Sequence, residues 1–171
     1  MLGSLAGGRL YDRMRGHPLI AGALAMMAAL MAAIPLVPRL WLLGFVLLVL
    51  GMGEGSLDVG CNTLLVWVHG HRVAPFMNGL HFFFGLGTFI APIVVAQVAL
   101  HTEGIAWAYR LLAIAVLPAA LWLVRLPSPS RPIKATGQAT GRQSVVLTAL
   151  VGAFLLCYVG AEVSFGGWVY S

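Results

Sequence analysis

Five long apolar stretches limit what this chain of 171 residues can fold into. They cover residues 18–38, 40–67, 75–100, 105–125 and 145–170. A helix rises about 1.5 Å per residue, so about 20 apolar residues cross a hydrocarbon core about 30 Å thick. Lipid cannot hydrogen-bond an open backbone, and the alternating pattern of membrane barrel strands is absent. The sequence therefore predicts an all-α polytopic membrane protein.

Basic residues are distributed unevenly between the two sides that these stretches define. If the N-terminus is cytoplasmic, then of the ten arginine and lysine residues only Arg39 and Arg110 lie toward the outside. The others lie on the cytoplasmic side: Arg9, Arg13, Arg15, Arg72, Arg125, Arg131, Lys134 and Arg142. The positive-inside rule then predicts a cytoplasmic N-terminus, with Ser171 on the outer side of the plasma or inner membrane. The basic residues are scattered over several loops, and this distribution indicates membrane topology and not nucleic-acid binding.

Composition and reactive residues argue against several classes of function. With 60% hydrophobic and 9% charged residues, the chain is unlike a soluble domain. Cys61 and Cys157 lie in separate stretches without a CxxC spacing, which argues against a disulfide or a metal site. We find neither a nucleophile beside a base nor a three-ligand metal set. We therefore expect no enzyme, no cofactor and no metal centre.

The second stretch contains polar residues that a helix would place on one face. Glu54, Asp58 and Asn62 follow one another at i, i+4 and i+8. An ionised Asp at the centre of a membrane helix costs roughly 2.5–3.5 kcal/mol on insertion scales. Residues kept at that cost indicate a partner, either another helix or a transported solute.

The segment from Gly8 to His17, GRLYDRMRGH, resembles the GxLxDRxGRR signature loop of the major facilitator superfamily. It carries one extra residue before the last glycine. The match assigns the signature to Gly8, Asp12, Arg13 and Gly16, where Gly8 would allow close helix approach and Asp12 would pair with arginines. A basic loop that only sets orientation is the alternative.

Three further segments resemble the fucose/glucose:cation symporter branch of this superfamily. Residues 57–62, LDVGCN, resemble an L-E-T-A-A-N-type segment of helix 4, with Asp58 replacing Glu. Residues 75–92 are similar to helix 5, and residues 158–168 to helix 7, of the sodium-dependent glucose transporter branch. The resemblance implies a partial major facilitator fold running from the end of helix 2 through helix 7. The chain would be a fragment without helix 1 and helices 8–12.

That resemblance implies that the chain is divided into three parts. Residues 1–126 would belong to the N-terminal bundle, 127–143 to a cytoplasmic linker rich in Pro, Ser, Gly and Thr, and 144–171 to the first helix of the C-terminal bundle. Short connections in the first part predict that consecutive helices pack as antiparallel neighbours. We expect the stretches over 18–38 and 105–125, which are poorest in ionisable residues, to face lipid.

The candidate coupling site lies on the second and third stretches. Asp58, Asn62, Asn78 and His81 reach similar depths if the two helices face each other. Asp58 would bind and release the coupling cation with Glu54 and His81, and Asn62 and Asn78 would hydrogen-bond sugar hydroxyls. Alternatively, these groups only join helices, at about 1 kcal/mol or less per contact.

Glu54 leaves more than one alternative open. Two ionised carboxylates one turn apart repel, so Glu54 and Asp58 could share a proton. The pair could instead hold Na⁺ with backbone oxygens. Glu54 could also pair with a helix that the chain lacks.

The fifth stretch contains a carboxylate flanked by aromatic residues. Tyr158, Glu162 and Phe165 fall on one helical face. A sugar has polar edges and an apolar face, so this trio is a candidate for substrate binding. The alternative is an interfacial glutamate near water.

Together, the motifs predict a secondary active transporter with cation-coupled sugar symport by alternating access. Its partners would be the lipid bilayer, a sugar, H⁺ or Na⁺, and the missing helices of a parent transporter. A multidrug/proton antiporter of the same superfamily is one alternative. An inactive truncated membrane module is the other.

Overall fold

The computed structural model describes residues 2–11, 13–102, 104–130 and 142–169, apart from some side chains within α1 and α6. The chain divides into two compact units, Met1–Pro132 and Ile133–Ser171. Each unit is described by itself below.

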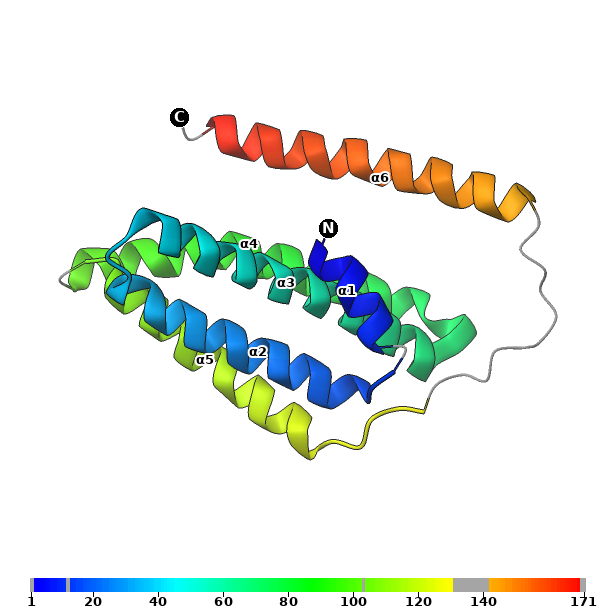
Figure 1. The fold of residues 1–171 in the computed structure, drawn as a ribbon, viewed down its shortest axis with the longest axis horizontal. Coiled ribbons are helices and arrows are strands. Elements are labelled where there is room, and N and C mark those ends of the chain that lie inside the picture. Colours follow the sequence, from blue (N-terminus) through cyan, green and yellow to red (C-terminus); the bar gives the residue numbers. More distant parts are fainter. Residues whose placement is uncertain (1, 12, 103, 131–141, 170–171) are drawn as a thin grey trace. The chain divides into compact units, whose positions relative to one another are not determined.

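Helices form nearly all of the described chain, and no strand occurs in it. The first unit contains α1 (Leu2–Tyr11), α2 (Gly16–Ala33), the 3-10 turn η1 (Ile34–Leu36), α3 (Leu40–His69), η2 (Gly70–Arg72), α4 (Ala74–His101) and α5 (Ala106–Arg125), and the second contains α6 (Arg142–Val169) (Figure 1). The predicted all-α fold is therefore confirmed.

Within the described residues, four helices of the first unit are long and apolar enough to cross a membrane: α2 with η1, α3 with η2, α4 and α5. They match the first four predicted stretches to within a few residues, because the bilayer sets their length. Residues 145–169 of the predicted fifth stretch lie in α6. Glycines mark two connections: Gly70 follows α3 with φ 52°, and Gly104 separates α4 from α5 with φ 117°. These positive φ values favour a residue without a Cβ atom.

Small residues bring α2 and α5 together along an antiparallel contact, the most extensive in the first unit (Figure 1). The buried residues on these two helices include Ala21 and Ala28 of α2 and Ala108, Ala113 and Ala120 of α5. Alanines allow helix backbones to approach closely, which favours van der Waals contact in lipid. The two helices poorest in ionisable residues therefore use part of their surface to pack on each other.

Helix α1 crosses α3 through glycines. A Cβ atom at Gly3 would overlap the backbone of Met52, and one at Gly7 would press on Ser56. Near the end of the crossing, Tyr11 is 1% exposed and joins a small apolar cluster with Ile20 and Leu64. The pattern of small residues four apart is the one that close membrane-helix pairs use.

Helix α4 departs from the prediction that consecutive helices pack as neighbours. It contacts α3 and α5 only sparsely, and none of its residues is buried. Bulky exposed side chains, among them Phe82, Phe83 and Phe84, line much of its surface. A short loop joins helix ends, but lateral packing needs small matching faces. The glycines of α4, which are Gly79, Gly85 and Gly87, have open space around them, so no close helix contact forms there in this unit.

Candidate functional site

The polar face of α3 is organised by a hydrogen bond between two predicted site residues. The side-chain amide of Asn62 donates to the Asp58 carboxylate oxygen Oδ1 at 3.0 Å and to the Asp58 carbonyl oxygen at 2.9 Å. Asn62 is half-buried, whereas Glu54 and Asp58 are exposed at the surface of the unit. The structure thus brings Asp58 and Asn62 together one helical turn apart.

This arrangement leaves one oxygen of the Asp58 carboxylate available to bind a proton or a cation. The amide of Asn62 orients Asp58 through Oδ1, while Oδ2 takes part in no hydrogen bond found in the described part of the chain. A carboxylate held at one oxygen can still accept a proton or coordinate a hard cation with the other. A polar ligand that competes for the Asn62 amide would also release Asp58.

The predicted partners on α4 are not joined to this pair. Asn78 and His81 are exposed on α4. The side-chain hydrogen bonds found on α4 stay within that helix: Thr88 donates to the Gly85 carbonyl, and His101 Nδ1 lies 2.8 Å from the Gln97 carbonyl. Within the described residues no hydrogen bond connects Asn78 or His81 to α3. Their place in one layer with Asp58 stays a prediction.

The predicted sugar-binding face of α6 is described in part. Tyr158 is exposed and stacks on Phe154 one turn earlier, with ring centroids 6.5 Å apart and planes inclined by 16°. The side chains of Glu162 and Phe165 lie outside the described residues. Of the three predicted residues only the side chain of Tyr158 is described, and its stacking partner Phe154 was not among them, so the sugar-binding role of the stripe stays a prediction.

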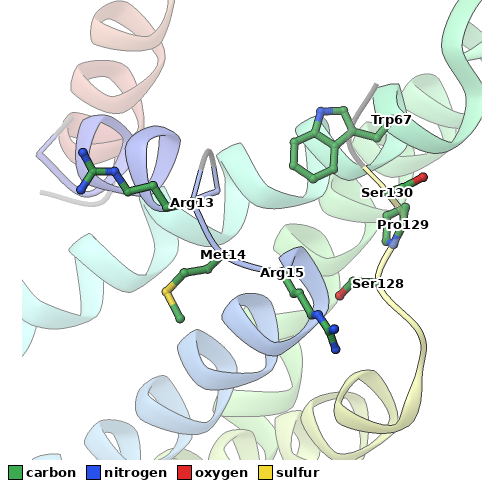
Figure 2. Close-up of a pocket in the computed structure, with 7 residues that line it drawn as sticks. All are labelled: Arg13, Met14, Arg15, Trp67, Ser128, Pro129 and Ser130. Atoms are coloured by element: carbon green, nitrogen blue, oxygen red, sulfur yellow. The ribbon is translucent and has the colours of Figure 1, made fainter. Parts of the chain in front are cut away.

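The signature loop lines a cavity of about 320 Å³ at one end of the first unit. Figure 2 shows its lining, which comes from the loop before α2, the end of α3 and the segment after α5: Arg13, Met14, Arg15, Trp67, Ser128, Pro129 and Ser130. In this view the guanidinium groups of Arg13 and Arg15 point in different directions. The three segments that the charge pattern assigns to the cytoplasm thus share one end.

The glycines of the signature differ in their surroundings. A Cβ atom at Gly16 would meet the Leu64 side chain, whereas Gly8 has open space around it. The predicted role of Gly8 in close helix approach is therefore taken by Gly3 and Gly7. Asp12 lies outside the described residues, so its predicted pairing with arginines stays a prediction.

The start of α2 receives a cap from a distant segment. Arg15 precedes the helix without a capping side chain. Instead the backbone N–H of His17 donates to the Ser128 hydroxyl at 3.0 Å, and His17 Nδ1 lies 3.4 Å from the Leu126 carbonyl. One free N–H of the first turn is satisfied in this way. No sequence signal identified Ser128, because it lies in a segment read as linker.

Among the described residues, no group of three or more His, Cys, Asp or Glu side chains lies close enough together to hold a metal ion. The thiols of Cys61 and Cys157 are both free.

The sequence profile of the Major Facilitator Superfamily matches residues 1–170 of the chain. The chain is 29% identical over 198 aligned positions to sodium-dependent glucose transporter 1 of Xenopus laevis, covering 99% of the chain and 40% of that relative. It is 28% identical over 207 positions to sodium-dependent glucose transporter 1A of Mus musculus, covering 99% of the chain and 49% of the relative.

Another relative is major facilitator superfamily domain-containing protein 4A of Danio rerio. It is 32% identical over 75 positions, which cover 44% of the chain and 14% of the relative. No solved structure gives a significant match. The chain spans less than half the length of the relatives that align with nearly all of it.

Proposed function

The chain belongs to the major facilitator superfamily, and from this membership we propose that it forms part of a secondary active transporter. In such a protein, two bundles rock around a site near the middle of the bilayer. The first unit contributes helices to one bundle, and α6 contributes one to the other. Because the relatives are more than twice as long, the proposal requires further helices to complete the pathway.

The proposed cargo is a sugar, and the proposed coupling ion is Na⁺. Support comes from the names of the relatives, which are sodium-dependent glucose transporters. It also comes from oxygen-rich groups on α3, since Na⁺ is a hard cation and prefers oxygen ligands. Glu54 and Asp58 lie one turn apart and together offer four carboxylate oxygens.

The observation that carries the proposal is the hydrogen bond from Asn62 to Asp58. In the proposed cycle, a sugar hydroxyl accepts a hydrogen bond from the Asn62 amide. The amide then leaves Asp58, and the carboxylate binds the cation more fully. Binding of either ligand thus favours binding of the other, which is the linkage that symport needs. His81 and Asn78 of α4 would complete the layer.

On α6, the proposal assigns sugar contact to Tyr158, Glu162 and Phe165. The exposed ring of Tyr158, stacked on Phe154, offers a flat apolar surface. A carboxylate one turn further along would accept hydrogen bonds from hydroxyl groups. Aromatic and carboxylate groups side by side match the apolar face and polar edges of a hexose.

Uptake of radiolabelled glucose into proteoliposomes tests this function. The liposomes contain the chain together with the helices that complete the transporter, and a Na⁺ or a pH gradient is imposed separately. We expect concentrative uptake under the Na⁺ gradient that ceases when the gradient is collapsed. Uptake driven only by the pH gradient would reassign the ion to H⁺. Absence of glucose uptake under both gradients would contradict sugar symport.

A further inference from the structure

A second cavity, of about 360 Å³, lies between α2 and α5, away from the polar face of α3. Its lining consists of four alanines of α2 and of Ala113 and larger side chains of α5: Ala25, Ala28, Ala29, Ala32, Trp107, Arg110, Ala113, Ile114 and Leu117. We call this cavity the alanine groove. Arg110 is its only charged lining residue, and the remaining lining is apolar.

The shape of the alanine groove follows from side-chain size. Ala28 and Ala113 are buried and form its floor. Ala25, Ala29 and Ala32 follow one face of α2 and leave a low wall. On α5, Ile114 and Leu117 are 63% and 41% exposed, and their larger side chains form the opposite, higher side of the groove. A thin, flexible apolar chain fits such a channel better than a rigid ring system does.

The length of the groove can be estimated from helix geometry. At about 1.5 Å per residue, Ala25 lies about 10 Å from Ala32 along α2, and Leu117 lies about 10 Å from Arg110 along α5. The two helices are antiparallel, so the groove runs inward from the level of Arg110. This places a charged head at one end of an apolar channel.

Arg110 is held in place at the mouth of the groove. Its guanidinium carbon lies 4.9 Å from the centroid of the Trp107 ring, an arrangement that favours a cation over the ring face. The residue lies one turn from the start of α5, and the ends of a membrane-spanning helix lie near the headgroup region. A guanidinium still has donors to offer while it rests on a ring, and its planar fork matches the oxygens of a phosphate.

We propose that the alanine groove binds a glycerophospholipid, with an acyl chain between α2 and α5 and its phosphate on Arg110. Charge complementarity selects this occupant, because the apolar channel and the single cation match an acyl chain joined to an anionic phosphodiester. A phospholipid without a second cationic group in its head, such as phosphatidylglycerol, leaves that charge uncontested. This site is independent of the proposed sugar and cation pathway.

Native mass spectrometry of the purified chain with added phosphatidylglycerol tests the proposal. We expect a retained lipid whose apparent dissociation constant rises roughly tenfold or more in Arg110→Gln, because a charge-assisted hydrogen bond is lost. Arg39→Gln serves as the matched control, since Arg39 is exposed near the same end and does not line the groove. Diacylglycerol with the same chains, and inorganic phosphate alone, should each bind more weakly.

Filling the groove gives a second, independent arm. Ala29→Leu should displace the acyl chain while keeping Arg110, and Ala119→Leu places the same side chain at an exposed position of α5 outside the groove. We expect lipid loss in the first variant only, with similar melting temperatures in both. If Ala29→Leu does not fold, Ala25→Leu replaces it.

Three results would each overturn the site. Phosphatidylglycerol could bind Arg110→Gln as tightly as the unmodified chain. Diacylglycerol could bind as well as phosphatidylglycerol. Ala29→Leu could retain lipid as Ala119→Leu does.

Discussion

At the scale of single residues, α3 places a hydrogen-bonded acid and amide within a membrane-spanning helix. The i, i+4 spacing of Asp58 and Asn62 made their contact predictable, because residues four apart share a helical face. Whether Asn78 and His81 of α4 face Asp58 could not be predicted in the same way, and both are exposed on α4. Sequence gives depth along one helix but does not give the rotation of its neighbour.

Replacing Asp58 by Asn tests the coupling role. The amide keeps the size of the side chain and can still accept from Asn62, but it can neither carry charge nor release a proton. We expect gradient-driven glucose uptake in proteoliposomes to be abolished, while exchange of labelled for unlabelled sugar at equal concentrations remains measurable. If gradient-driven uptake is unchanged in Asp58→Asn, Asp58 is not the coupling group.

At the scale of helices, their existence and ends could be predicted, while most of their lateral partners could not. Bilayer thickness fixes the length of each span, and charges and glycines mark the connections. All the spans are similarly apolar, so hydropathy does not distinguish α5 from α4 as the partner of α2. That choice depends on small residues such as Ala28 and Ala113, which allow close approach.

The crossing of α1 and α3 gives a stability prediction at this scale. In Gly3→Ala the new methyl group would overlap the Met52 backbone, which cannot move aside as a flexible side chain can. We expect the free energy of unfolding to fall by about 1–3 kcal/mol, the usual cost of overpacking. The measurement is the midpoint of thermal unfolding in detergent, which should be lower than in the unmodified chain.

Gly8→Ala is the matched control for this crossing. It lies on the same helix, and its Cβ atom would meet open space. Its unfolding midpoint should stay unchanged or rise slightly, because alanine has the higher helix propensity. Equal destabilisation by both substitutions would show that α1 and α3 do not pack through Gly3.

At the scale of the whole molecule, one end of the first unit gathers three segments that are far apart in the sequence. The arginine-bearing loop before α2, the end of α3 and the segment after α5 meet at one cavity. The charge pattern predicted this grouping, since it places the basic residues near all three segments on the cytoplasmic side of the membrane. It did not predict the bond from His17 to Ser128, which ties the segment after α5 to the start of α2.

Labelling with a membrane-impermeant maleimide tests the orientation. In a Cys61→Ser, Cys157→Ser background, a cysteine at Ser130 should react only after the cells are permeabilised. A cysteine at Val37, in the connection between η1 and α3, should react in intact cells. This result follows from the positive-inside distribution of arginines. The reverse pattern would place the N-terminus outside the cell.

The sparse packing of helix α4 affects how long this chain persists in a cell after synthesis. This span has no buried residue and only sparse contacts with α3 and α5, and it carries an amide and an imidazole that hydrocarbon solvates poorly. In cells, chaperones and proteases continuously remove chains of marginal stability. We therefore expect the lifetime of the chain after synthesis to be short when it is made alone, and to lengthen when the further helices of the proposed transporter are made with it.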